Sequence, residues 1–192
     1  MISGSFNFDQ IKPVNPLLAL FPSEPYGIEH AYRVFKLVDK ICDFTELDLE
    51  NRQVLKFSAL FSDIGKEKTM DVNHGFKSYQ KLSEYNFLGK SRFNNELCRF
   101  LMQCQAIRSD ELESHLEKYQ IENREEAILL LKILKDALAL DAFRFGNFCA
   151  ADLELSCSKK LVLFASQFYR KNLNQDFILK EIEDWLSRTN NN

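Results

Sequence analysis

The sequence predicts an all-α protein with a single domain. Apolar residues recur at three- and four-residue spacings through most of the chain after Gly27, as in the stripe formed by Ile28, Tyr32 and Phe35. The four prolines all precede Gly27 and the 192 residues include only six glycines, so little interrupts a helix beyond that point. A chain of this length can bury one hydrophobic core. We therefore expect a bundle of about seven or eight helices and no strand.

Seven helical segments account for these patterns, each with an apolar stripe between polar flanks. They are residues 28–44, 49–65, 75–85, 94–107, 124–145, 159–172 and 175–188. The longest, 124–145, carries apolar residues on more than one side and is expected to be buried. The N-terminal arm, residues 1–26, and the tail, residues 189–192, are expected to be irregular or disordered. The expected helical domain therefore covers residues 27–188.

Composition excludes several classes of partner. Hydrophobic residues make up 45% and charged residues 28% of the chain, as in ordinary globular proteins, and the net charge of -3 gives no general attraction to nucleic acid or anionic membranes. No apolar run is long enough to span a bilayer, and the N-terminus lacks the pattern of a secretory signal. Five cysteines without a C-x-x-C pair favour reduced thiols. We expect a cytoplasmic protein that binds neither membrane nor nucleic acid.

Polar residues interrupt the apolar helices at three places. They are His30 in the first helix, the pair Ser62-Asp63 at the end of the second, and the section from Asp136 to Arg144 in the long helix. An acidic residue at the end of an apolar helix is costly to bury unless it has a partner. These three places are therefore the candidates for a functional site.

Four segments at these places resemble the HD-domain metal-dependent phosphohydrolases. In chain order they are GIEHAYRV (27–34), SALFSDIGK (58–66), NHGFKS (73–78) and LKDALALDAFRFG (134–146), and the likeness extends over about residues 27–168. The resemblance implies an HD-type helical bundle in which a histidine, an adjacent His-Asp pair and a later aspartate hold one metal ion. Imidazole and carboxylate ligands suit divalent cations, and such an ion can activate water to attack a phosphate ester.

The resemblance retains only part of the metal-binding set. His30 matches the first ligand and Asp63 matches the aspartate of the pair. Ser62 stands where the histidine of the pair belongs, and Leu138 stands at the position of the later aspartate. A neutral hydroxyl is a poor ligand and an aliphatic side chain cannot coordinate a metal. Two of the four implied ligands are therefore replaced.

Two further residues are candidates to compensate for these losses. Asp141 follows Leu138 by three positions on nearly the same face of the helix, and His74 resembles a histidine that some relatives place near the site. Asp136 lies about 200° around the helix from Leu138 and is expected to face away. The depleted set predicts either no cofactor or a weakly bound divalent cation such as Mn²⁺, Mg²⁺, Ni²⁺ or Fe²⁺.

Cationic side chains fall at or beside the matched segments. Asp63 and Lys66 are the candidate catalytic residues, and Arg33, Lys66, Arg108 and Arg144 are the candidate phosphate-binding residues. Arg108 stands where relatives often carry a further histidine. If several of these cations converge, they can hold a phosphate without a metal. The alternative is that each is an ordinary surface or ion-pair residue.

The sequence leaves three functions open. The first is a degenerate, catalytically impaired HD-domain protein that binds a nucleotide or phosphorylated small molecule, or acts as a regulatory module. The second is an active metal-dependent phosphohydrolase with a non-standard metal site. The third is a scaffold in which a protein partner binds the surface. The replacements at Ser62 and Leu138 favour the first.

Overall fold

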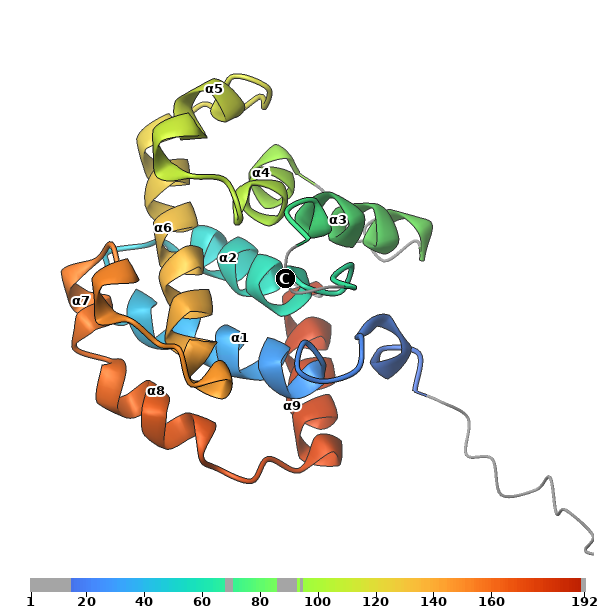
Figure 1. Ribbon diagram of the computed structural model, residues 1–192. Helices are drawn as coiled ribbons and strands as arrows, with labels where there is room; N and C mark the ends of the chain where they lie inside the picture. Colours follow the sequence, from blue (N-terminus) through green and yellow to red (C-terminus); the bar gives the residue numbers. More distant parts are fainter. Residues whose placement is uncertain (1–14, 68–70, 86–92, 94, 191–192) are drawn as a thin grey trace, which may run out of the picture.

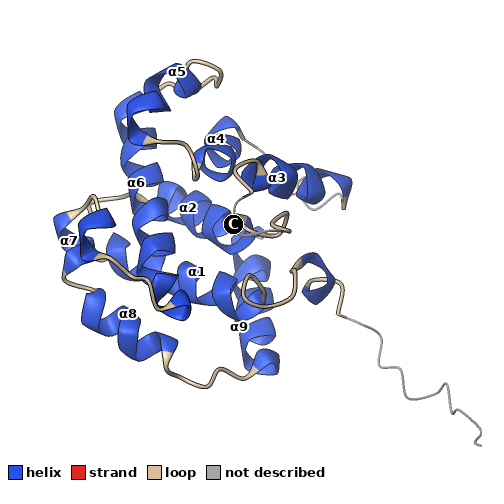
Figure 2. Ribbon diagram, in the orientation of Figure 1, coloured by secondary structure: helices blue, strands red, loops and turns tan. Residues whose placement is uncertain are grey.

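The computed structural model describes residues 15–67, 71–85, 93 and 95–190, and their regular structure is entirely helical (Figures 1 and 2). No strand occurs among these residues. The α-helices are α1 (Ile28–Cys42), α2 (Leu49–Phe61), α3 (His74–Glu84), α4 (Glu96–Cys104), α5 (Leu112–Leu116), α6 (Arg124–Leu140), α7 (Ser156–Lys159), α8 (Val162–Tyr169) and α9 (Gln175–Asn190). The 3₁₀ turns are η2 (Leu18–Leu20), η3 (Ser109–Glu111), η4 (Asp141–Phe145) and η5 (Ala150–Asp152).

The all-α prediction is confirmed. The seven expected segments correspond to α1–α4, α6, α8 and α9, and the described residues add the short helices α5 and α7. Helix α5 was not predicted because it lies in a charged segment, and only two of its own residues, Leu112 and Leu116, are buried. None of the described helices combines the length and the apolar character that crossing a membrane requires.

The core lies where α1, α2 and α6 pack against one another, with α4 beside α2 and α9 beside α1 (Figure 1). Aromatic rings fill the space around α2: the ring of Phe57 lies 4.5 Å from that of Phe93 and 4.8 Å from that of Phe61. Helix α6 buries residues on several sides, since Leu130, Ile133 and other neighbours are wholly inaccessible. The predicted burial of the long helix is therefore found in the structure.

Side-chain caps begin α2, α4 and α6, and Asn174 caps α9 in the same way. Asp48, Asn95 and Asn123 accept hydrogen bonds from the backbone amides three residues on, at 2.7, 2.8 and 3.2 Å respectively. Each cap satisfies an amide that has no partner inside the helix, and losing one costs about 1 kcal/mol. These caps begin α2, α4 and α6, whose C-terminal ends carry the site described below.

Two glycines allow α3 to approach the rest of the bundle closely. A Cβ atom at Gly75 would overlap the carbonyl oxygen of Met102 in α4, and one at Gly65 would overlap the backbone of α3 at Ser78. A side chain at either position would therefore push α3 away from the end of α2. This close approach brings His74, the first residue of α3, to the end of α2.

Both ends of the described chain are more ordered than the sequence analysis expected. The arm was expected to be irregular, but it forms η2 and buries Leu17, Leu20 and Tyr26 against the bundle. The tail was expected to begin at residue 189, but α9 continues to Asn190 and buries Thr189, whose hydroxyl bonds the carbonyl of Trp185. Apolar burial and the continued helix explain both corrections. Residues 1–14 and 191–192 lie outside the described residues.

Candidate functional site

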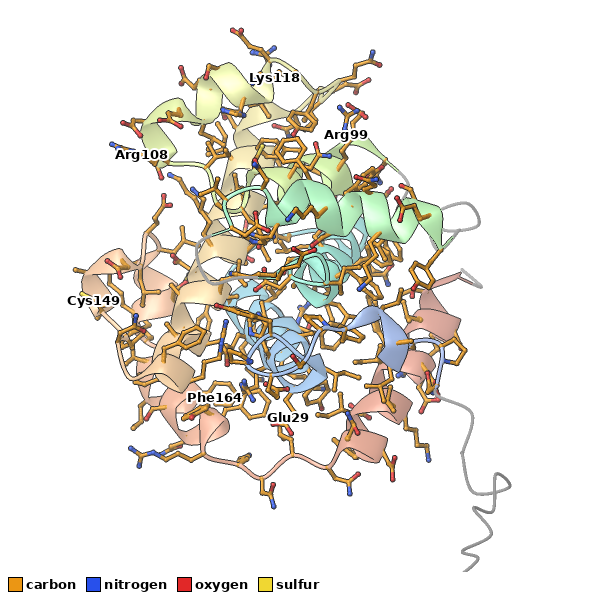
Figure 3. All side chains as sticks on the ribbon, turned by 45° about the vertical axis from the view of Figure 1, so that its right-hand side comes forward. Glu29, Arg99, Arg108, Lys118, Cys149 and Phe164 are labelled. Carbon is orange, nitrogen blue, oxygen red and sulfur yellow. The ribbon has the colours of Figure 1, made fainter. Side chains whose placement is uncertain are left out.

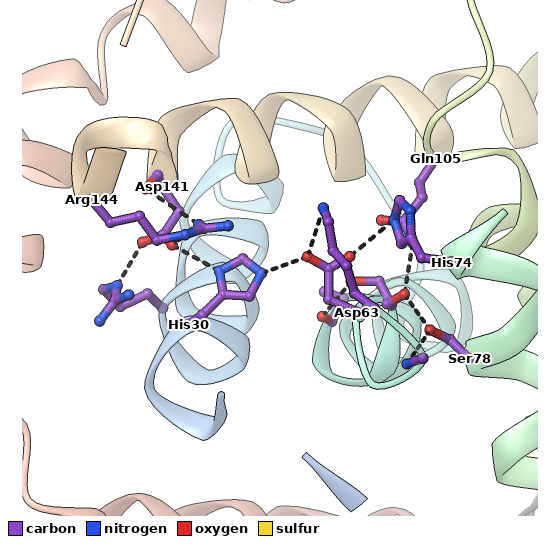
Figure 4. Close-up of polar contacts among 12 residues, drawn as sticks. His30, Asp63, His74, Ser78, Gln105, Asp141 and Arg144 are labelled. Carbon is purple, nitrogen blue, oxygen red and sulfur yellow. Dashed lines mark hydrogen bonds and ion pairs between the residues drawn. The ribbon is translucent and has the colours of Figure 1, made fainter. Parts of the chain in front are cut away.

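His30 lies between two carboxylates that come from the ends of two other helices (Figure 4). It stands in the first turn of α1 and is only 1% exposed. Its Nδ1 atom lies 2.8 Å from Oδ2 of Asp141, and its Nε2 atom lies 3.0 Å from Oδ2 of Asp63. Both contacts are hydrogen bonds when both ring nitrogens carry protons. The site is thus assembled from α1, the end of α2 and the end of α6.

The Asp141 side of His30 is a closed ion-pair network. Arg33, one turn after His30, donates its Nε–H to Oδ1 of Asp141 at 2.6 Å, and Arg144 donates to Oδ2. Burial alone would raise the pKa of Asp141, but the hydrogen bond from His30 and the charge of Arg33 outweigh it and lower the pKa. Asp141 and Asp63 contact opposite nitrogens of one imidazole, so Asp141 cannot join Asp63 and His30 around a single ion.

Asp63, at the end of α2, lies on the Nε2 side of His30 and also contacts Lys66 and His74. Its Oδ2 atom lies 3.5 Å from Nζ of Lys66, and its Oδ1 atom lies 3.1 Å from Nε2 of His74. The second contact is close enough for an ion pair, but Oδ1 lacks a well-aligned hydrogen bond among the described residues. Burial would raise the pKa of Asp63, yet the hydrogen bond from His30, the contact with His74 and the charge of Lys66 hold it well below its usual value.

His74 is oriented by its own helix start. Its Nδ1 atom contacts the carbonyl oxygen of Asp71, which leaves Nε2 directed at Asp63. A backbone carbonyl on one ring nitrogen fixes which nitrogen faces a site. The structure therefore places His74 beside Asp63, as the resemblance implied, although this position reads as an ordinary helix start in the sequence.

The two replaced positions also lie at this site. The Ser62 hydroxyl donates to the carbonyl of Ala59 at 3.2 Å, back into its own helix, and the Leu138 side chain lines the same cavity as Asp63. The Ser62 carbonyl accepts hydrogen bonds from Ser78 at 2.7 Å and from Gln105 at 2.8 Å. These bonds hold the end of α2 in place. Neither Ser62 nor Leu138 directs a metal-binding atom toward Asp63.

A cavity of about 280 Å³ opens beside Asp63. The buried polar atoms Asp63 Oδ1, Gln105 Oε1 and Arg144 Nε have no hydrogen-bond partner among the described residues, and all three residues line this cavity. Lys66 adds an ammonium group, which lies 4.5 Å from the ring centre of Tyr26. Unpaired buried polar atoms of both kinds suit a ligand that both accepts and donates hydrogen bonds. The lining residues are Asp63, Lys66, His74, Gln105, Ala106, Leu138, Arg144 and Phe145.

The predicted phosphate-binding cations separate into two groups. Lys66 and Arg144 line the cavity, whereas Arg33 lies behind Asp141 and does not. Arg108 lies at the surface, with 75% of its side chain exposed, and pairs with Asp110 at 2.9 Å (Figure 3). The chain leaves α4 at Cys104 and turns outward before Arg108. Only two of the four cations therefore face the site.

Sequence reasoning missed Gln105, Ser78 and Tyr26. Gln105 is buried and stands in the apolar run LMQCQAI. A polar amide at the end of an apolar helical run is a sequence signal that could have indicated a polar site. Ser78 donates to the carbonyl of Ser62 and accepts from the amide of Gly65 at 2.9 Å. Nothing in the sequence pattern distinguishes Ser78 or Tyr26 from ordinary helix and loop residues.

The residues present do not fit the four-ligand metal centre that the resemblance implies. No group of three or more histidine, cysteine, aspartate or glutamate side chains in the described parts of the chain has a metal-binding arrangement. Asp141 lies behind His30, while Ser62 and Leu138 offer no suitable ligand atom. Instead, the Lys66 ammonium lies beside Asp63, and Arg144 lines the same cavity. This donor set suits an anion better than a divalent cation.

A comparison of the sequence with protein-family models gives a match in the region of this site. The HD domain family model matches residues 27–142, a range that includes His30, Asp63, His74 and Asp141. Neither the curated proteins nor the solved structures give a significant match to this chain. The family match covers more than half of the 192 residues and agrees with the convergence of His30 and Asp63. This chain belongs to the HD domain family.

Proposed function

We propose that this chain is a degenerate HD-domain protein that binds a phosphate-bearing small molecule, such as a nucleotide, without a metal and with impaired hydrolysis. The observation that carries the proposal is the cavity beside Asp63, where Lys66 and Arg144 supply charge and two implied metal ligands are replaced by Ser62 and Leu138. Guanidinium and ammonium groups bind phosphate oxygens through charge-assisted hydrogen bonds.

The unpaired atoms in the cavity support a ligand of this kind. Arg144 Nε is a buried donor without an acceptor, and a phosphate oxygen would supply one. Gln105 Oε1 is a buried acceptor, which suits a hydroxyl or amino group on the same ligand. Residues of the apolar wall, Leu138, Ala106 and Phe145, can contact the part of the ligand that carries no charge.

The proposed chemistry is binding and orientation. Lys66 and Arg144 would neutralise the phosphate, and His30 would keep Asp63 ionised and in place. The two arginines on the Asp141 side would keep His30 oriented, because they hold its carboxylate partner. A regulatory role, a cytoplasmic location and any protein partner stay predictions from the sequence.

Calorimetric titration in the presence of a chelator tests this function. Inorganic phosphate and a nucleoside monophosphate are titrated into wild type, Lys66→Met, Arg144→Met and Arg108→Met, each checked for folding by circular dichroism. We expect wild type to bind, and loss of either cavity cation to weaken binding by about tenfold or more, because each removes a charge-assisted hydrogen bond. Arg108→Met is the matched control and should bind as wild type does. Absence of binding by the folded wild type would end the proposal.

An active phosphohydrolase is the second candidate function. The observation in its favour is the preserved His30–Asp63 pair with Asp141 behind the imidazole, since a carboxylate commonly supports a metal-binding histidine in this way. Hydrolysis of nucleotides or phosphate esters with added Mn²⁺, Mg²⁺, Ni²⁺ or Fe²⁺, abolished by Asp63→Asn, would establish this candidate in place of the first.

A further inference from the structure

A second cavity, of about 300 Å³, lies between α1, α2 and α9. It shares no lining residue with the cavity beside Asp63. Residues of α1 and α2 form one wall, and these belong to the range matched by the HD domain model. The opposite wall comes from α9, which lies beyond that range. The cavity therefore forms only because α9 packs against the part of the chain that the HD domain model matches.

The charge of this cavity is unbalanced. Lys36, Lys56 and Arg188, from three different helices, face one carboxylate, Glu181, which pairs with Lys36 at 3.1 Å. The Lys56 ammonium pairs with Asp39, which does not line the cavity, and burial lowers the pKa of Lys56 despite that partner. Three cations against one anion attract a negatively charged ligand, although the whole chain carries a net charge of -3.

Arg188 has the most freedom to bind such a ligand. Its side chain lies at the exposed end of α9, and its Nε–H donates to the carbonyl of Asp184 within the helix at 3.0 Å. None of the ion pairs found among the described residues involves its guanidinium group. The terminal nitrogens of a guanidinium can bind a carboxylate or phosphate through two hydrogen bonds.

Aromatic rings form the apolar part of the wall. The ring of Trp185 lies 5.1 Å from that of Phe35 at an interplanar angle of 74°. The Lys56 ammonium lies 4.4 Å from the centre of the Phe35 ring and 5.7 Å from that of Trp185. Positive charge is thus held beside flat apolar surface, a combination that suits a planar ring carrying an anionic group.

Gln53 provides an acceptor with no donor. Its Oε1 atom is buried and has no hydrogen-bond partner among the described residues, although the residue lines the cavity. Buried polar atoms in folded proteins are almost always hydrogen-bonded, so this oxygen is suited to an N–H or O–H group entering the cavity. The feature is separate from the charge imbalance and points to a ligand independently.

We propose that the cavity between α1, α2 and α9 is a second ligand site, which binds a small planar organic anion bearing an N–H donor. The anionic group lies against Arg188 and the two lysines, and the ring contacts Phe35 and Trp185. The N–H group donates to Oε1 of Gln53. This assignment does not depend on phosphate binding beside Asp63, because the two cavities have no residue in common.

The only tryptophan of the chain, Trp185, reports directly on this site. We would titrate 2-aminobenzoate, a planar anion with an N–H donor, and follow quenching of tryptophan fluorescence, corrected with free N-acetyltryptophanamide. Benzoate lacks the donor and aniline lacks the charge. We expect saturable quenching by 2-aminobenzoate, affinity about tenfold lower for benzoate because one buried hydrogen bond is lost, and no saturation by aniline.

Variants identify the contacts. Arg188→Met and Lys56→Met should each weaken 2-aminobenzoate binding by about tenfold, because each removes a charge-assisted contact. Gln53→Leu should remove the preference for 2-aminobenzoate over benzoate. Lys66→Met, at the other cavity, should bind as wild type does and is the control. Arg188 is exposed, so its variant remains informative if Lys56→Met does not fold.

Three results would overturn the proposal. They are wild type that shows no saturable quenching by 2-aminobenzoate, equal affinity for 2-aminobenzoate and aniline, and wild-type affinity in Arg188→Met. Loss of binding in Lys66→Met with retention in Arg188→Met would move the anion site to the other cavity and would equally refute this one.

Discussion

The two sides of His30 have opposite characters. On the Nδ1 side, both oxygens of Asp141 are bonded, one to Arg33 and the other to His30 and Arg144. On the Nε2 side, one oxygen of Asp63 lacks a hydrogen bond and lines a cavity. The Nδ1 side is a closed support, whereas the Nε2 side is open to a ligand.

The two residues that stand where the resemblance implies metal ligands both fall on the open side. Ser62 adjoins Asp63, and Leu138 lines the cavity beside it, while the Asp141 network has every charged partner in place. A buried charge left without its partner destabilises a fold strongly, so the support is constrained by stability. A side chain whose only role is to bind a ligand can change without leaving a buried charge unpaired. Substitutions on the open side can therefore change ligand binding without unfolding the domain.

The largest expected effect comes from breaking the closed side. Asp141→Ala leaves Arg33, Arg144 and His30 buried without their shared carboxylate, and we expect the free energy of unfolding to fall by about 3–5 kcal/mol. Urea unfolding followed by circular dichroism measures the loss. Asp110→Ala removes the carboxylate of an exposed pair and should cost no more than about 1 kcal/mol. Equal losses in the two variants would show that the closed network does not support the fold.

The sequence predicted which helices meet at this site but not where every side chain points. The resemblance placed His30 and Asp63 together, and Nε2 of His30 lies 3.0 Å from Oδ2 of Asp63. Helical spacing did not give the partner of Asp141. It placed Asp141 on nearly the same face as Leu138, one turn further along, but it did not show which atoms of the neighbouring helix lie opposite that turn. In the structure Asp141 contacts Nδ1 of His30, and it does not line the cavity.

The same limit applies around the end of α4. Arg108 lies three residues after Gln105, yet Gln105 is buried in the cavity and Arg108 is exposed. Periodicity cannot locate a side chain after a helix has ended, because the path of the loop depends on tertiary contacts. The apolar stripes of α1 and α6 were predictable for the opposite reason, since regular backbone fixes which residues share a face.

The next largest effect should come from restoring the open side. Ser62→His combined with Leu138→Asp introduces two ligand types at the positions where the resemblance implies them, and we expect the affinity for Mn²⁺ or Ni²⁺ to rise by about 100-fold or more. Isothermal titration with each metal measures the change, and the single variants show whether both residues are needed. The matched control is Leu138→Asn, which removes the apolar side chain without adding a charge. Unchanged affinity in a folded double variant would show that these positions do not face a common point.

Acid should weaken the closed side measurably. The pKa of Asp141 is lowered in the folded protein, so the unfolded chain takes up this proton at a higher pH than the folded chain does. Its stabilising effect is therefore complete above the ordinary pKa of 3.8 and is lost as the pH falls through the folded value. Urea unfolding between pH 5 and pH 3 should show a steeper loss for wild type than for Asp141→Asn.

Asp43 provides the comparison for this experiment. Its pKa is also lowered, chiefly by a hydrogen bond from Arg52, but it lies at the surface. Solvent and salt screen an exposed pair, so Asp43→Asn should change the acid dependence less than Asp141→Asn does. The same acid dependence in the two variants would show that burial does not increase the contribution of the Asp141 network to stability.

The smallest effect should distinguish two serines at the boundary between the sides. Ser78 donates to the carbonyl of Ser62 and accepts from the amide of Gly65. Ser78→Ala leaves that amide without its partner, while the Ser62 carbonyl keeps its bond from Gln105, and the change should cost about 1–3 kcal/mol of unfolding free energy. The hydroxyl of Ser62 only donates back to Ala59, whose carbonyl lies within α2, so Ser62→Ala should cost less than about 1 kcal/mol. Phosphate affinity should be unchanged in Ser62→Ala. A large loss of affinity there would mean that this hydroxyl binds the ligand itself, at the position where the resemblance implies a histidine.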